Sequence, residues 1–194
     1  MNTVTKYNFS VDTSTEDAVM NICKSLKEVI DNIYNKNQNI VVLCIGTDRS
    51  TGDSLGPLVG TKLSSALKDT NITVLGTVHN PVHAKNLEEN IEYIKSDIKN
   101  PFVIAIDASL GGVDKIGYVN VFNRPIKPGA GVNKKLPEIG DIGITGVINV
   151  SGFMEYMVLQ NTRLSVVMDL ADKISSSLYF TLKNYSFNRF SARA

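Results

Sequence analysis

Short apolar runs alternate along the chain with segments in which apolar residues recur every three or four positions. The runs are rich in β-branched residues, which is typical of strands covered on both faces, and the spaced segments indicate amphipathic helices. Strands are predicted over residues 40–45, 72–78, 102–106, 116–122 and 142–150. Helices are predicted over residues 14–35, 55–67 and 87–98, with one long helix or two over residues 152–182.

The strand and helix order from residue 40 to residue 106 predicts an α/β fold with a mostly parallel sheet. In a 2-1-3 strand order, the first and third of these strands are neighbours. Residues 116–122 follow the third strand after a short glycine turn, so we predict an antiparallel edge strand there. A chain of 194 residues has the length of a single domain. We divide it into an N-terminal helical segment (1–37), a core (38–182) and a frayed tail (183–194).

Two later segments extend this picture. Residues 123–141 contain three of the six prolines and show no hydrophobic period, which is typical of a functional loop when it occurs in a compact domain. In the helical segment 152–182, the spacing favours a core role for several apolar side chains. Those nearest its start are Met154, Met157, Val158 and Leu164.

Composition and charge exclude several classes of protein. A hydrophobic content of 43% with 20% charged residues is enough for a full core, and a net charge of +1 provides no field for binding nucleic acid. Cys23 and Cys44 match neither a zinc site nor a disulfide framework. No leader-like or membrane-spanning run is found, so a cytoplasmic protein without nucleic-acid or membrane partners is expected. Apolar helices at both chain ends are compatible with a homo-oligomer.

Two aspartates follow predicted strands at the edge where an open α/β sheet binds its ligands. Asp53 lies in the glycine-bearing loop 46–57, between the first strand and a helix, and Asp107 ends the third strand. An isolated Asp53 could serve as a helix cap, whereas a carboxylate at the end of a buried strand needs a charge, a proton or a metal. Because these strands are expected to be neighbours, the two carboxylates should face each other.

Facing carboxylates have two chemical uses, and the sequence leaves both open. They can share one proton and activate a water molecule, since two like charges at close range cannot both ionise. Alternatively, Asp53 and Asp107 can hold a divalent cation that polarises a carbonyl group and lowers the pKa of a bound water. No dedicated cofactor is predicted beside this candidate metal.

Other motifs give weaker signals. His79 and His83 have the spacing of a metal pair, but Pro81 lies between them in an expected loop, so a capping or surface role is predicted. The loop glycines match neither nucleotide-binding pattern, and no nucleophile elbow is present. Ser109 is predicted to be a turn residue.

Four segments together resemble the spore germination protease family and, more closely, its short relatives, the YyaC-type sporulation proteins. The segments are residues 45–48, 52–57 with the D-x-L-G-P motif, 103–108 with the I-D-A motif, and 126–132 with the P-G-x-G-V motif. The resemblance covers about residues 38–182. It implies a three-layer αβα sandwich of the phosphorylase/hydrolase-like type, which is shared with hydrogenase-maturation endopeptidases. The family's essential aspartates match Asp53 and Asp107.

The resemblance also implies a function. Germination proteases cut small acid-soluble spore proteins, so we expect a sporulation-associated peptidase with Asp53 and Asp107 as the catalytic pair and a protein or peptide substrate. The expected substrate-binding residues are Asp48, Pro128, Gly129 and Gly131. The hydrogenase-maturation relatives place a nickel-binding histidine late in the sheet, where this chain has none. Two alternatives stay open: a non-catalytic binding or assembly protein of the spore, and a metal-dependent hydrolase at the same pair.

Overall fold

The computed structural model describes residues 5–129 and 136–191. Within these ranges six strands form one sheet. The strands are β1 (Asn8–Asp12), β2 (Asn39–Cys44), β3 (Thr73–Leu75), β4 (Pro101–Gly111), β5 (Tyr118–Phe122) and β6 (Ile142–Val150). The α-helices are α1 (Ala18–Ile33), α2 (Leu55–Ala66), α3 (Leu87–Asp97), α4 (Glu155–Gln160) and α5 (Leu164–Ser191). Two short 3-10 helices are η1 (Gly52–Ser54) and η2 (Val113–Lys115).

The strand order in the sheet is β1-β5-β6-β4-β2-β3. The pairs β2–β3, β2–β4 and β4–β6 are parallel, and β5 is antiparallel to both β6 and β1. The predicted 2-1-3 order is confirmed, because β2 lies between β3 and β4. The chain leaves β2 toward β3 and later returns to β4 on the other side. The carboxyl ends of β2 and β4 therefore form a topological switch point, where sheets of this kind bind ligands.

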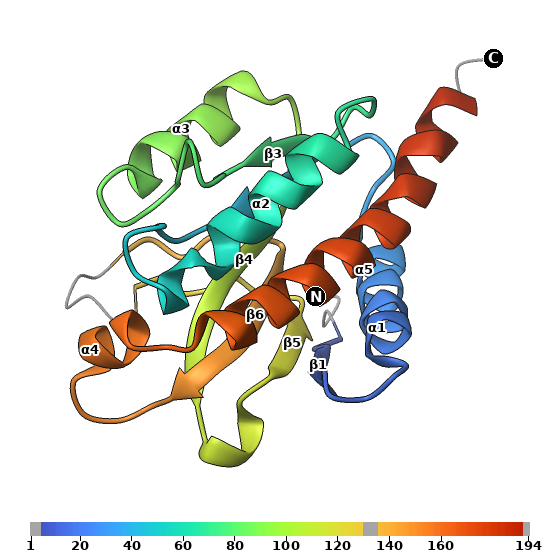
Figure 1. The fold of residues 1–194 in the computed structure, drawn as a ribbon. Helices are drawn as coiled ribbons and strands as arrows, with labels where there is room; N and C mark the ends of the chain where they lie inside the picture. The colour runs from blue at the N-terminus through green and yellow to red at the C-terminus, as the bar shows by residue number, and fades with distance from the viewer. Residues whose placement is uncertain (1–4, 130–135, 192–194) are drawn as a thin grey trace.

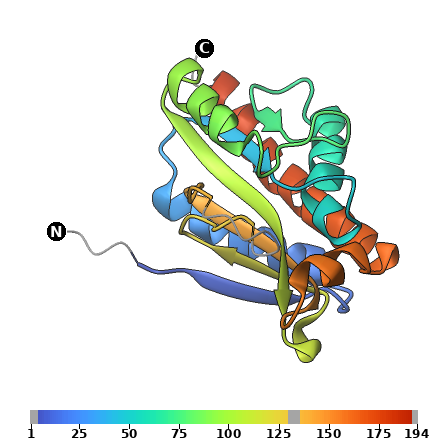
Figure 2. The same ribbon diagram turned by 90° about the vertical axis from the view of Figure 1, so that its left-hand side faces the viewer.

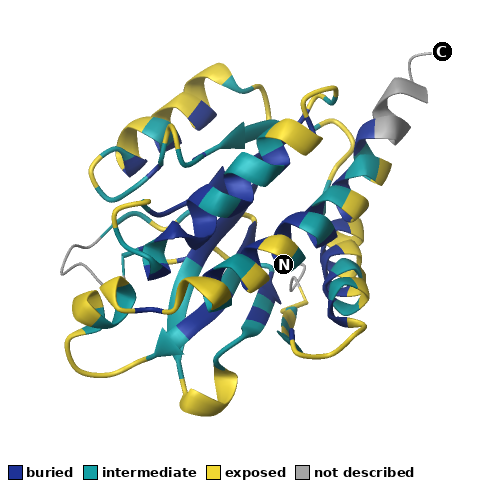
Figure 3. Ribbon diagram, viewed as in Figure 1, coloured by how far each residue is buried: buried dark blue, intermediate teal, exposed yellow. Residues whose placement is uncertain are grey.

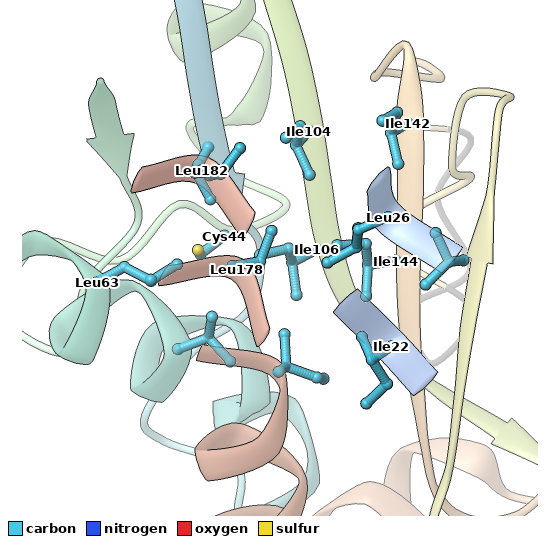
Figure 4. Close-up of a cluster of buried hydrophobic side chains, with 14 of the residues drawn as sticks. Ile22, Leu26, Cys44, Leu63, Ile104, Ile106, Ile142, Ile144, Leu178 and Leu182 are labelled. Carbon is cyan, nitrogen blue, oxygen red and sulfur yellow. The ribbon is translucent and has the colours of Figure 1, made fainter. Parts of the chain in front are cut away.

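Helices cover both faces of the sheet, as expected for an α/β fold (Figure 1). Ile40 and Val42 of β2 pack in the same buried cluster as the apolar faces of α1, α2 and α5, and Figure 4 shows part of this cluster. The alternate residues Val41 and Leu43 pack with α3 in a second cluster. In the turned view of Figure 2, α2 and α5 lie together on one side of β4. Alternate side chains of β2 thus point to opposite faces of the sheet and pack in two separate cores. The sheet and the helices on its two faces form three layers.

The N-terminal region differs from the helical segment that we predicted for residues 1–37. Residues 8–12 form β1, which pairs antiparallel with β5, so β5 is an inner strand and not the predicted edge. The Thr13 backbone N–H donates a 3.2 Å hydrogen bond to the Gly117 carbonyl and extends this long-range pairing. Helix α1 then begins at Ala18, without a side-chain capping bond from Asp17. A five-residue strand that depends on a partner more than 100 residues away leaves little local signal.

The C-terminal region also differs from the sequence prediction. Helix α5 continues to Ser191, through most of the predicted tail 183–194. Tyr185 explains part of this extension, because its ring meets Tyr34 edge to face at 5.8 Å and its hydroxyl donates to Asp31 of α1. In the described parts of the chain, no helix has both the length and the apolar character needed to cross a bilayer.

The helical segment predicted over residues 152–182 consists of two helices. The chain between α4 and α5 includes the buried Thr162, whose hydroxyl donates to the Val158 carbonyl at 2.8 Å. Three of the predicted core residues, Met154, Met157 and Leu164, are about half exposed, at 54%, 48% and 57%. An apolar period alone therefore overestimated the core at the start of this segment.

Candidate active site

The two candidate aspartates occupy different elements at the switch point. Pairing of β2 with β4 ends at Cys44 opposite Ile106, so Asp107 is the first residue of β4 beyond the end of β2. Strand β4 continues beside β6 and has a register irregularity between Ser109 and Leu110. Bulges of this kind are frequent next to active sites. Asp107 was predicted to end its strand and instead lies inside a longer one.

Asp53 is held by a tight loop between β2 and α2. The Thr47 backbone N–H donates to the Asp53 carbonyl at 3.1 Å, and the Gly46 N–H donates to the Val82 carbonyl at 2.8 Å. Gly46 has a φ of +139°, and a Cβ atom on it would lie 1.9 Å from the Asp53 carbonyl oxygen. A Cβ atom on Gly56 would lie 2.0 Å from the Ile45 carbonyl oxygen. Only glycine permits these two approaches, so the loop glycines fix where Asp53 lies.

Asp53 and Asp107 line one cavity of about 410 Å³ at this edge of the sheet. Much of the lining is apolar, from residues that include Ile45, Ala108 and Leu110. The cavity is large enough for a few residues of a peptide, and its volume lies within the usual range of ligand pockets. The structure therefore brings together the two carboxylates that the strand order predicted to be close.

The two carboxyl groups interact electrostatically and differ in environment. Burial raises the pKa of Asp107 well above its ordinary value, and the charge of Asp53 raises it further, against a 2.8 Å hydrogen bond from the Ala108 N–H. Burial also raises the pKa of Asp53, while the Thr47 N–H and the charge of His83 act in the opposite direction. Asp107 is the more deeply buried of the two. It is the group that keeps its proton to higher pH.

His83 is the site residue that the sequence prediction missed. It lies in the segment between β3 and α3, is half-buried, and lines the same cavity as the two aspartates. Its backbone N–H donates to the Asn86 side chain at 2.8 Å, which fixes the start of α3 beside the cavity. His79 is exposed and does not line the cavity. The strand-end rule that selected the aspartates also applies to the segment after β3, since β3 neighbours β2.

The predicted substrate-binding residues have three different outcomes. Pro128 and Gly129 line the cavity, and Gly129 has a φ of +89°. Asp48 is exposed and is not part of the cavity lining; its carboxylate accepts a 3.4 Å hydrogen bond from the Thr47 hydroxyl. Gly131 lies outside the described residues. The cavity thus includes the start of the 123–141 loop but excludes Asp48.

Two serines in the cavity lining differ in their hydrogen bonds. The Ser109 hydroxyl donates to the Gly146 carbonyl at 3.2 Å and so connects β4 with β6. The Ser50 hydroxyl is buried and has no partner within the described structure. A buried polar atom without a partner is costly, and such atoms are rare in folded proteins. Ser50 is therefore free to hydrogen-bond to a bound molecule.

The model of the family described as "Protein of unknown function (DUF1256)" matches residues 10–177. The chain belongs to this DUF1256 family. A Bacillus subtilis (strain 168) relative, "Uncharacterized protein YyaC", is 52% identical over 160 residues, which are 81% of this chain and 78% of that protein. The YyaC-type resemblance is thereby confirmed.

A solved structure shares the fold of this DUF1256 protein. It is the crystal structure of a NiFe hydrogenase maturation protease, HycI, from Thermococcus kodakarensis KOD1. The two chains superpose with a TM-score of 0.55 at 19% sequence identity, over 82% of this chain and 99% of that one. The predicted hydrogenase-maturation-like α/β fold is confirmed, and at this identity the likeness concerns the fold alone.

The neighbour's class raises the question of a metal in the DUF1256 site. Across the described residues, no group of three or more His, Cys, Asp and Glu side chains is arranged to hold a metal ion. Asp53 and Asp107 alone would leave most of a cation's coordination to solvent or substrate, because divalent ions bind four or more ligands. The described side chains therefore do not form a complete metal site.

Proposed function

We propose that this protein is a peptidase in which Asp53 and Asp107 activate a water molecule against a peptide carbonyl. The observation that carries the proposal is the pair of interacting carboxyl groups in one apolar cavity, of which Asp107 retains its proton to higher pH. Two carboxyl groups that share a proton can act as acid and base at once. The fold shared with a maturation protease supports the same class of reaction.

The two aspartates carry one proton between them at the start of the reaction, and it lies on Asp107. The Asp53 carboxylate takes a proton from water as the water oxygen attacks the carbonyl carbon, while Asp107 donates its proton to the carbonyl oxygen. In the second step the C–N bond breaks, Asp53 returns its proton to the leaving amine, and Asp107 recovers a proton from a hydroxyl of the tetrahedral intermediate. Both carboxyl groups finish in their starting states. The raised pKa of Asp107 suits it to the role of acid.

The remaining lining residues have supporting roles in this proposal. The backbone N–H of Gly129 would bind the substrate backbone or the developing oxyanion. The Ser50 hydroxyl would donate to a substrate carbonyl, which would satisfy its unused hydrogen-bonding capacity. The apolar lining would limit competing water around the reacting carbonyl.

The substrate class that we propose follows from the YyaC-type relationship. The motifs around Asp53, Asp107 and Pro128 in this chain resemble those of spore germination proteases. We therefore propose small acid-soluble spore proteins as the first substrates to test, and a role during sporulation.

Mass spectrometry of a small acid-soluble spore protein incubated with the purified chain tests the proposal. Hydrolysis produces pairs of fragments whose masses sum to the substrate plus one water. The Asp53→Asn variant, purified in the same way, controls for contaminating peptidases. An intact substrate would assign the protein to a non-catalytic binding role. If a chelator abolishes cleavage and one divalent ion restores it, the pair belongs to a metal-dependent hydrolase.

His83 is expected to influence the pH at which the peptidase activity rises on the acid side of its pH profile. Its charge lowers the pKa of Asp53, which must be ionised to accept the water proton. Replacing His83 with Gln removes that charge, so the pKa of Asp53 rises and the ascending limb of the kcat/KM profile moves to higher pH. The matched variant His79→Gln, at the exposed histidine outside the cavity, should leave the profile in place. A limb that does not move in His83→Gln would remove His83 from the mechanism.

A further inference from the structure

The exposed large apolar side chains of this protein are concentrated at one place. Five of the nine that are recorded for the described residues lie between residues 153 and 164, and Phe153 is 91% exposed. Figure 3 shows α4 and the turn before it largely in the exposed colour. The α4 apolar surface, as we define it, consists of Phe153, Met154, Tyr156 and Met157. Contiguous exposed apolar groups on a folded domain mark interaction sites.

The inner side of α4 is firmly attached to the rest of the molecule. The Asn149 side chain of β6 donates to the Thr162 hydroxyl at 3.2 Å, and that hydroxyl donates to the Val158 carbonyl. Gly52, next to Asp53, packs so closely against α4 that a Cβ atom would lie 2.9 Å from the Leu159 carbonyl oxygen. The outer apolar side chains are therefore displayed by an anchored helix beside the loop that holds Asp53.

The backbone that leads into α4 is strained where it displays these side chains. Met154 has a φ of +59°, which is uncommon for a residue other than glycine. Its side chain is 54% exposed, so burial of that side chain does not offset the strain. Strain of this kind clusters at ligand-binding segments. A bound partner would explain both the strained backbone of Met154 and the exposure of its side chain.

The α4 apolar surface is continuous with the candidate active site. Tyr156 belongs to both, because it lines the cavity and is 55% exposed. Leu159, on the next turn of α4, also lines the cavity. A chain lying in the cavity and leaving it past Tyr156 would reach Met157 and Phe153 directly. This continuity favours the molecule in the cavity as the occupant of the surface.

We propose that the α4 apolar surface binds an apolar segment of the substrate polypeptide, adjoining the segment held in the cavity. The proposal rests on the proposed peptidase function and narrows its substrate class to unfolded or extended chains with large apolar side chains. A folded protein keeps most such side chains buried, whereas an extended segment offers them to Phe153 and Met157. Substrate specificity would then depend on α4 as well as on the residues at the reacting carbonyl.

The double variant Phe153→Ser/Met157→Ser tests the proposal. With a small acid-soluble spore protein as substrate, KM is expected to rise about tenfold at nearly unchanged kcat, because the lost contacts lie away from the reacting bond. A tetrapeptide cut from that substrate around its cleavage site is too short to reach the surface and measures the cavity alone. The matched control is Met20→Ser/Phe180→Ser, which also removes one exposed methionine and one exposed phenylalanine, 54% and 58% exposed, here from the groove between α1 and α5.

A binding measurement separates this proposal from the peptidase proposal. Fluorescein-labelled, reduced and carboxymethylated lactalbumin serves as an unfolded probe, and its anisotropy is read with the Asp53→Asn variant. Binding that the Phe153/Met157 substitutions weaken about tenfold supports the docking surface even if no peptide bond is ever cut. Equal binding and equal KM in both double variants would overturn it. A change of sedimentation coefficient in the Phe153/Met157 variant alone would also overturn it and assign the surface to a second copy of the chain.

Discussion

Replacing Asp107 with Asn is expected to lower kcat/KM for peptide hydrolysis by at least about 10³-fold while leaving the fold intact. Asparagine has nearly the shape of aspartate, and its Oδ1 can still accept the 2.8 Å hydrogen bond from the Ala108 N–H. It has no proton of suitable acidity for the carbonyl oxygen. The loss should therefore appear in kcat, and binding of an uncleaved peptide should persist.

The same substitution is expected to stabilise the protein at neutral pH. Asp107 has a higher pKa in the folded chain than in the unfolded chain, mainly because of burial and secondly because of Asp53. Between these two pKa values the folded state binds more protons, so the stability of the wild-type protein falls as pH rises through that window. Below the unfolded value of about 3.9 the penalty is absent. The uncharged asparagine side chain avoids this penalty, which should raise the free energy of unfolding by about 0.5–2 kcal/mol near pH 7.

Urea denaturation of the wild type and the Asp107→Asn variant at a series of pH values measures this effect. The two curves should converge toward pH 4 and separate as pH rises. Asp69→Asn is the matched control, since Asp69 is exposed and lies in the turn after α2, away from the cavity. A variant that is inactive and less stable than the wild type at pH 7 would instead indicate a structural carboxylate and favour the binding-protein alternative.

Periodicity and strand order were sufficient to predict that Asp53 and Asp107 lie at the same edge of the sheet, where they line one cavity. The apolar runs that form β2 and β4 are readable because both faces of these strands are buried. The alternation of strand and helix then indicated that the two strands run parallel and end at the same edge. Asp53 and Asp107 follow from these two facts together. Their placement required no knowledge of side-chain geometry.

Features that depend on distant contacts were not readable in the same way. Strand β1 exists through its pairing with β5, and the helical extension around Tyr185 depends on packing against Tyr34. The spacing between His79 and His83 does not identify His83 as a site residue, because Pro81 lies between the two histidines. The position of His83 after β3, which borders β2, would have placed it at the same edge of the sheet as the aspartates.

The exposed residues of α4 show a different limit of prediction from the sequence. Periodic spacing predicts an apolar face, but it does not say whether the protein itself covers that face. Met157 and Leu164 have core-like spacing and remain about half exposed. An apolar residue buried in the core and one displayed to a partner look identical in the printed sequence. Only the packing around Thr162, which turns one side of α4 inward, separates the two roles.

Replacing Gly46 with Ala is expected to cause a large loss of stability, more than about 4 kcal/mol. The new Cβ atom would lie 1.9 Å from the Asp53 carbonyl oxygen and 3.1 Å from the Pro57 ring. The Asp53 carbonyl is backbone of η1 and Pro57 lies in the first turn of α2, so neither can retreat as a flexible side chain would. The φ of +139° adds strain for any residue with a Cβ atom. Thermal and urea unfolding, together with peptidase activity, measure the outcome.

Gly152→Ala separates backbone strain from steric crowding. Gly152 also has a positive φ, +155°, but a Cβ atom there would meet nothing within 4 Å. We expect Gly152→Ala to lower the free energy of unfolding by about 1–3 kcal/mol through backbone strain alone. The additional loss in Gly46→Ala then measures the cost of the close approach to the Asp53 carbonyl. If the two variants lose equal stability, the loop between β2 and α2 can shift to accommodate the added methyl group. Gly46 would then not be what fixes Asp53 opposite Asp107, and the precision of the pair would have to come from η1 and its packing against α4.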